Sequence, residues 1–345
     1  MAISPVAVGN KITASLINSI ISAVNAVPSS RRNFLLNSDF GINQRSPGST
    51  YTAVGFFQDR WRIHTALTGG ALYTGTNVTI ANTFGTKLAL QFISSSATNS
   101  ATFGQALPSD EVAKLRGQTI VFSAKLLSSA AATVTMKIQT SVTADADASA
   151  TWTDLVSTGM SVTTTPTVYT TNSATVPTTA NGIRVQFVLS NVPNTTTITF
   201  GQTQLEIGSV ASTWNLQTGS IGNELSACQR YYWRTTSDST ATSAAFAVGV
   251  GGTTTAANTW VTFPVDMRVV PTLETTGTAS NYRLSNPGSS DTALNAVPVL
   301  SGSGSTTRLG QITGNVAAGL TVGTGYVLRA NALANVYIGF SAELA

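Results

Sequence analysis

The chain has 345 residues, of which 42% are hydrophobic and only 9% charged, and its formal net charge is +4. Ordinary soluble domains carry roughly 25% charged residues. The normal hydrophobic content excludes a highly charged disordered chain, and so small a charge without a basic cluster argues against a nucleic-acid partner. The single cysteine excludes an intrachain disulfide, and no apolar run predicts insertion into a membrane.

The first predicted element is a helix over residues 9–27, "GNKITASLINSIISAVNAV". Apolar residues recur there at helical spacing, and Pro28 ends the pattern. Because this helix has few charged residues, it would not stay soluble by itself, and we expect it to pack against another part of the protein or another chain. One alternative is docking on its own domain. The other is that residues 1–30 attach the chain to a larger assembly or to other copies of itself, through Ile12, Leu16, Ile20 and Val24.

Residues 31–218 are predicted to form an antiparallel β-sandwich. Apolar and polar residues alternate in "QTIVFSAKL", "TVTMKIQT" and "GIRVQFVLS", as strands with one buried face require. Turn-rich segments separate these strands, and a short helix over 108–116 is the one helical signal between them. The pattern therefore indicates an all-β fold.

A linker helix is expected within residues 219–234, followed by a second, smaller β-sandwich over 235–345. Ser220 is a suitable N-cap, and the apolar stripe of the helix would comprise Ile221, Leu225, Cys228 and Tyr232. In the second unit, "VTFPVDM" and the terminal "NVYIGFSAEL" both alternate as strands do.

Residues that could carry catalysis are few. His64 is the only histidine, which excludes a multi-histidine zinc site within one chain, and no nucleophile-elbow motif accompanies it. We expect it to be structural. The acids are dispersed and indicate no glycosidase pair, although Asp145 and Asp147 leave a weak calcium site open as an alternative. We therefore predict no enzyme, no metal site and no cofactor.

Three aromatic residues in loop-like contexts could stack on the apolar face of a sugar ring. They are Tyr51 in "GSTYTAVG", Trp152 in "ADASATWTD" and Tyr282 in "ASNYRLSNPG". The alternative for each is an aromatic side chain that anchors its loop to the core.

The stretch 31–62 is unusual, because it holds seven of the charged residues of a chain that uses few. Its segment Asn33–Arg45 and the triplet Asp59, Arg60 and Trp61 resemble the start of a β-sandwich module of bacteriophage tail fibre and minor tail proteins. "QLEIGSVAST", Gln204–Thr213, is similar to the end of that module, and "IGNELSACQRYY" to the helix that follows it.

The resemblance implies a jelly-roll-like sandwich similar to carbohydrate-binding modules. Asp59 and Arg60 would tie the first strand to the body, Trp61 would fill the core, and Arg45 with Gln44 would satisfy buried backbone groups. The resemblance also implies a virion protein that is assembled in the host cytoplasm, forms a homotrimer and contacts other virion proteins. We expect a tail fibre, tail tip or spike that binds a host-surface polysaccharide. The alternative is a capsid decoration or head fibre protein without a receptor.

Overall fold

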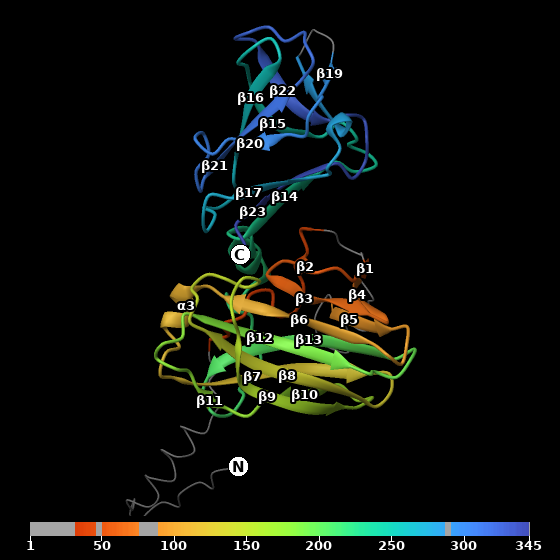
Figure 1. Cartoon of the computed structure of the whole chain (residues 1–345), viewed down its shortest axis with the longest axis vertical. Helices are drawn as coiled ribbons and strands as arrows, with labels where there is room; N and C mark the ends of the chain where they lie inside the picture. The colour runs from red at the N-terminus through yellow and green to blue at the C-terminus, as the bar shows by residue number, and fades with distance from the viewer. Residues whose placement is uncertain (1–31, 46–49, 76–88, 287–290, 345) are drawn as a thin grey trace, which may run out of the picture.

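The structure, a computed structural model, describes residues 32–45, 50–75, 89–286 and 291–344. It confirms the all-β fold. A larger β-sandwich and a smaller C-terminal β unit lie one above the other, and the end of the chain returns to the junction between them (Figure 1). No helix in these ranges is long and apolar enough to cross a membrane. The helix predicted over 9–27, with Ile12, Leu16, Ile20 and Val24, lies outside the described residues.

Two antiparallel sheets form the sandwich. The first has the order β1 (Thr50–Tyr51), β4 (Gly70–Gly75), β5 (Ala89–Ser94), β13 (Thr197–Ile207), β7 (Thr119–Ser128), β10 (Thr167–Thr170), with β11 (Ala174–Thr175) also paired to β7. The second has the order β2 (Gly55–Gln58), β3 (Trp61–Thr68), β6 (Ser100–Leu107), β12 (Gly182–Ser190), β8 (Ala132–Ser141), β9 (Thr153–Val162).

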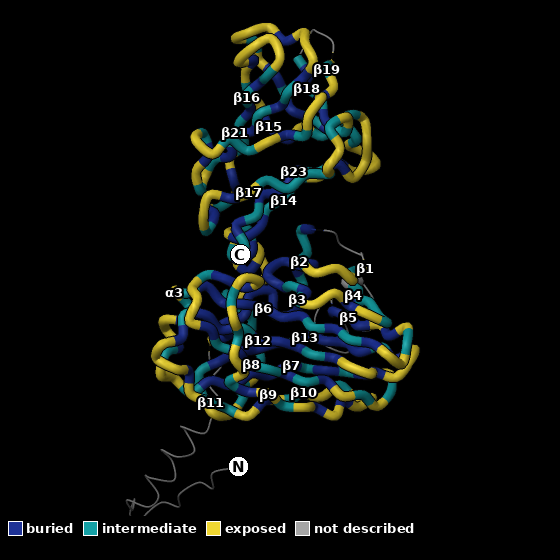
Figure 2. The backbone as a smooth tube through the Cα atoms, viewed as in Figure 1, coloured by how far each residue is buried: buried dark blue, intermediate teal, exposed yellow. Residues whose placement is uncertain are grey.

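The core of the sandwich lies between these two sheets, because the alternating apolar residues of each strand point inward. The buried tube segments in Figure 2 run through the middle of the sandwich, and the exposed ones follow its loops. Phe187 on β12 contacts the rings of Phe103, Phe122 and Phe200. This aromatic cluster joins strands of both sheets.

Both predicted helices are present, and each is shorter than expected. Helix α3 spans Ser109–Ala113, and α4 spans Ile221–Gln229 with the Ser220 hydroxyl accepting from Asn223 N at 3.3 Å. The predicted apolar stripe of α4 is half right: Cys228 and Tyr232 are buried, whereas Ile221 is 53% and Leu225 38% exposed. The buried face also carries the carboxylate of Glu224, which accepts hydrogen bonds from the backbone N–H groups of residues 37 and 218.

The C-terminal unit also contains two antiparallel sheets, as expected of a second β-sandwich. The smaller has the order β14 (Tyr232–Thr236), β23 (Tyr337–Ser341), β17 (Thr272–Thr275). The larger has the order β19 (Thr292–Ala293), β18 (Tyr282–Ser285), β22 (Gly325–Ala330), β15 (Ala245–Gly251), β16 (Ala256–Thr262), β21 (Leu309–Asn315), β20 (Val299–Leu300). A 3₁₀ turn, η1, covers Ala279–Asn281.

Two expectations for this unit need adjustment. Strand β14 begins at Tyr232, inside the segment expected to be a linker helix. Strand β16 ends at Thr262, so "VTFPVDM" is mostly not a strand, although Phe263 and Met267 are still buried in the core. The terminal alternation from Val336 to Leu344 is confirmed, with β23 at its centre.

The stretch 31–62, which we call the opening stretch, supplies hydrogen bonds to the interior of the sandwich through its described residues. Trp61 is fully buried, and its Nε1 donates to the carbonyl of Asn37 at 3.0 Å. Asp59 is also buried, and its carboxylate accepts from the backbone N–H of Gln44 at 2.6 Å and from its side-chain amide at 2.8 Å. Because buried polar groups need partners, these hydrogen bonds offset part of the cost of burial, although burial still raises the pKa of Asp59 to about 6.

Two arginines of the same stretch bind the C-terminal unit. Arg60 forms an ion pair with Glu343, and the two side chains are only 2% and 3% exposed. Arg45 lies 3.5 Å from Glu343 and 3.4 Å from Glu274. Arg45 was expected to satisfy backbone groups, whereas its guanidinium contacts carboxylates. We call these four residues the junction network.

Aromatic rings and a small apolar cluster complete the junction. The guanidinium of Arg60 lies 3.8 Å from the ring centre of Tyr231, and that of Arg45 lies 3.6 Å from the ring centre of Tyr232. Leu36 and Ile42 pack with Cys228 and Tyr231 in one cluster. The opening stretch, α4 and the chain end are therefore packed together.

Replacing Glu343 by Gln should destabilise the junction strongly. The change leaves the buried Arg60 without its counter-charge, and removing one partner of a buried pair costs about 3–5 kcal/mol. Scanning calorimetry should show a lower melting temperature and separate melting of the two units. The control is Asp266→Asn, which breaks the exposed pair between Asp266 and Arg308 and should leave the melting profile unchanged. Equal melting of Glu343→Gln and the wild type would contradict this role.

Candidate functional site

The outward side of the six-stranded sheet carries a continuous set of polar side chains, which we call the polar face. Its members alternate with core residues on four strands, so that they all point away from the core. They are Arg62 and His64 on β3, Arg184 and Gln186 on β12, Lys137 and Gln139 on β8, and Asp154 on β9. The strand register places Arg62, Gly104, Gln186 and Lys137 in one row.

The loop over residues 142–152 folds back onto this face and adds two residues to it. Asp147 is buried, and its Oδ1 lies 3.0 Å from Nε2 of His64 and 3.6 Å from the Arg184 guanidinium. Trp152 donates from Nε1 to the carbonyl of Asp147 at 2.9 Å, and the Arg184 guanidinium lies 4.5 Å from the centre of its ring. The tryptophan and the ion pair therefore hold each other in position.

His64 is held in one neutral form. Its Nδ1 lies 3.2 Å from the side-chain amide of Gln186, and an Nε2–H tautomer would donate to Asp147 while accepting from that amide. Burial lowers the pKa of His64 despite the nearby Asp147. Burial also opposes ionisation of Asp147, but the hydrogen bond from His64 and the charge of Arg184 outweigh it, so the pKa of Asp147 is lowered.

Amides and opposite charges are linked along the rest of the polar face. Arg184 donates to the amide oxygen of Gln139 at 2.6 Å, and Gln139 donates to Asp154 at 2.6 Å. Lys137 donates to the other oxygen of Asp154 at 2.7 Å, at the rim where the two side chains are 24% and 40% exposed. Such a fixed array offers hydrogen-bond donors and acceptors side by side, which is what a polyhydroxylated ligand needs.

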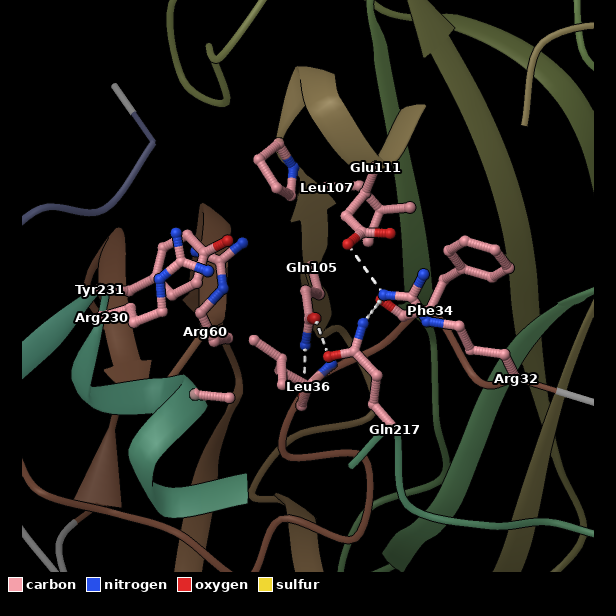
Figure 3. A pocket seen from close by; sticks show the side chains of 12 residues that line it. Arg32, Phe34, Leu36, Arg60, Gln105, Leu107, Glu111, Gln217, Arg230 and Tyr231 are labelled. Atoms are coloured by element: carbon pink, nitrogen blue, oxygen red, sulfur yellow. Dashed lines mark hydrogen bonds and ion pairs between the residues drawn. The ribbon is translucent and has the colours of Figure 1, made fainter. Parts of the chain in front are cut away.

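A separate pocket of about 150 Å³ lies beside the junction. Figure 3 shows Arg60, Arg230 and Tyr231 on one side of it, Arg32, Phe34, Glu111 and Gln217 on the other, and Leu36 and Gln105 between them. Three segments converge here, namely the opening stretch with its β2–β3 turn, the β6–α3 segment, and the end of α4 with the segment before it. None of these residues apart from Arg60 was singled out from the sequence.

The three aromatic residues predicted to bind a ligand lie in different surroundings. Trp152 joins the polar face. Tyr51 on β1 is half-buried, with its ring 5.7 Å from that of Phe57. Tyr282 is 0% exposed and its hydroxyl bonds Thr276 and the carbonyl of Tyr337 at 2.6 Å, so it fills the C-terminal core and its ring offers no surface to a sugar.

Asp145 and Asp147, the two acids considered as calcium ligands, bind different partners. Asp145 accepts from the backbone and hydroxyl of Ser109 at the start of α3, whereas Asp147 binds His64. Among the described residues, no group of three or more His, Cys, Asp or Glu side chains could hold a metal ion.

No protein-family model matches this sequence. No curated protein matches it either. Among solved structures, the enzymatically active domain of tailspike protein 4 of bacteriophage CBA120 is similar at a TM-score of 0.36 and 14% identity, over 51% of this chain but 21% of that chain.

Two carbohydrate-binding modules are similar at the same level. TmCBM61, solved in complex with β-1,4-galactotriose, has a TM-score of 0.32 and 11% identity over 51% of this chain and 99% of that chain. The CBM22-1 xylan-binding domain of Paenibacillus barcinonensis Xyn10C has a TM-score of 0.29 and 11% identity over 48% and 99%. Likenesses this distant assign no function.

The neutral state of His64 makes the stability of the sandwich depend on pH. Since its folded pKa is lowered, the unfolded chain binds the proton more readily, and this part of the stability is lost as the pH falls below about 6.5. We expect His64→Gln, whose amide can still donate to Asp147, to lose less melting temperature than the wild type between about pH 7.5 and about pH 5. Parallel melting curves for the two proteins over this range would contradict the assignment.

Proposed function

We propose that this chain is a bacteriophage virion protein, a tail fibre, tail tip or spike, whose sandwich binds a host-surface glycan through the polar face. The virion role is supported by the motifs that resemble tail fibre and minor tail proteins. Residues of three motifs form internal contacts. Trp61 forms a hydrogen bond within the opening stretch, and Glu206 of "QLEIGSVAST" accepts from Ser212 at 2.6 Å. Helix α4 packs against the opening stretch at the junction. These motif residues therefore support the scaffold, and the polar face is built from other residues.

The polar face is the observation that carries the glycan proposal. Guanidinium, ammonium, amide and carboxylate groups stand in adjacent rows on a rigid sheet, and each is held by a neighbour. Groups fixed in this way lose little conformational freedom when they bind a ligand. Trp152 adds an aromatic ring at one end of the array, where the loop over residues 142–152 meets the sheet.

The state of the acids on this face supports binding without hydrolysis. A glycosidase needs one carboxyl group that stays protonated near neutral pH and acts as the acid. Hydrogen bonds from Lys137 and Gln139 lower the pKa of Asp154 despite its partial burial, and the pKa of Asp147 is also lowered. Neither residue suits the role of the acid, so we propose that the protein is not an enzyme.

Assembly would involve other parts of the chain. The apolar stripe of residues 9–27 could form a three-helix seam in a homotrimer and attach it to other virion proteins. A surface rich in Thr, Ser and Gly with few charges suits a protein that functions outside the cell, in the assembled virion.

Changes at the exposed rim of the polar face test the glycan proposal without disturbing the core. We expect the double variant Lys137→Gln with Asp154→Asn to bind host cells and their purified polysaccharide about tenfold more weakly, because charged hydrogen bonds to hydroxyls are lost. A pull-down and a solution titration would measure it. Arg308→Gln, at an exposed arginine of the C-terminal unit, is the matched control. If only the control lost binding, the receptor site would lie in that unit instead.

The location is tested by immunogold labelling of intact virions. Label at the tail is the expected result, whereas label spread over the head would replace the proposal with the decoration role.

Incubation of the protein with host polysaccharide tests whether it hydrolyses its ligand. We expect no oligosaccharide to be released, and release of fragments would contradict binding without hydrolysis.

A further inference from the structure

The charged residues that line the pocket beside the junction are mostly positive. Three arginines reach it, and Glu111 is its one carboxylate. Arg32 pairs with Glu111 at 2.8 Å, and Arg60 pairs with Glu343. Arg230, at the exposed end of α4, has no hydrogen bond or ion pair from its guanidinium to any described residue. The donors of the Arg230 guanidinium are therefore open to a ligand.

Two further polar atoms at the pocket are buried and lack a hydrogen-bond partner among the described residues. They are Nε of Arg60, whose side chain is only 2% exposed, and Oε2 of Glu111. A buried polar group without a partner is unfavourable. Arg60 also has a positive φ of 68°, which is unusual for a residue other than glycine and is found more often at functional sites.

The groups without a partner at this pocket are guanidinium donors and a carboxylate acceptor, and together they indicate what kind of ligand would fit. Guanidinium groups bind carboxylate or phosphate oxygens with short, charge-assisted hydrogen bonds. Glu111 remains ionised, because the hydrogen bonds from Lys114 and Arg32 outweigh its burial and lower its pKa. Its free oxygen can therefore only accept, as from a sugar hydroxyl. Phe34 and Tyr231 provide apolar walls.

We infer that this pocket binds an acidic sugar unit, with its carboxylate or phosphate on Arg230 and Arg60 and a ring hydroxyl on Glu111. The inference rests on the proposed glycan binding, to which it adds a second site and the class of sugar bound there. Pockets for whole drug-sized ligands measure roughly 300–1,000 Å³. A volume of about 150 Å³ suits one charged sugar residue of a longer chain.

The test is a titration of the full chain with galacturonic acid, glucose 6-phosphate, neutral galactose and inorganic phosphate, followed by ligand-observed NMR. We expect the two acidic sugars to bind and galactose to bind about tenfold more weakly, because it lacks the charged group. Arg230→Gln should weaken the acidic sugars about tenfold, and Arg230→Lys less, because it keeps the charge. Arg230 is exposed, so these variants should fold, and Arg308→Gln should bind as the wild type does.

Several results would overturn the inference. They are equal binding of galactose and galacturonic acid, unchanged binding by Arg230→Gln, and no binding of either acidic sugar up to about 50 mM. Inorganic phosphate that competes as well as the sugars would reject the contact to the ring hydroxyl. If Arg230→Gln binds host polysaccharide normally while the rim variant of the polar face does not, this inference fails and the proposed function stands.

Discussion

The carboxylate of Glu343 is the group on which the relation between the two units depends. It comes from the last residues of the described chain and is buried against Arg60 and Arg45 of the opening stretch. A buried ion is tolerated only when it is paired and hydrogen-bonded. The arrangement therefore cannot form until residues nearly three hundred positions apart have met, and it specifies one way of joining the units.

The ion pair between Arg60 and Glu343 also fixes one wall of the pocket beside the junction. Arg60 has a strained backbone, and its guanidinium is fixed by Glu343, by the carbonyl of Ala106 at 2.7 Å and by the ring of Tyr231. A group held from three directions cannot swing away when a ligand arrives. The strain at Arg60 is thus offset by the junction, and rigidity at the pocket follows from the attachment of the C-terminal unit.

The scarcity of charge in this chain has a positional meaning. In most soluble proteins charged side chains cover the surface. Here many lie at the junction, around the pocket or on the polar face, and several are almost fully buried. Hydroxyl and small side chains cover much of the remainder. The charged residues of this chain thus lie mainly where ion pairs and hydrogen bonds hold polar side chains in fixed positions.

The sequence predicted the parts of the fold that depend on local periodicity. Strands with apolar alternation, such as the one containing Phe187, and the capped start of α4 were readable because neighbouring residues determine them. Half of the stripe of α4 was misjudged, because Glu224 is buried by hydrogen bonds to the backbone of Asn37, far away in the sequence, and of Thr218. The partnerships of Arg60 with Glu343 and of His64 with Asp147 could not be predicted, since they depend on how loops and units meet in space.

The single cysteine of the chain gives the junction a chemical reporter. Cys228, on the inward side of α4, is fully buried in the apolar cluster with Leu36, Ile42 and Tyr231, and burial raises the pKa of its thiol well above the ordinary value. Thiol reagents attack the thiolate form and need access to it. Alkylation would therefore proceed only when α4 parts locally from the opening stretch, and its rate would report how often this happens.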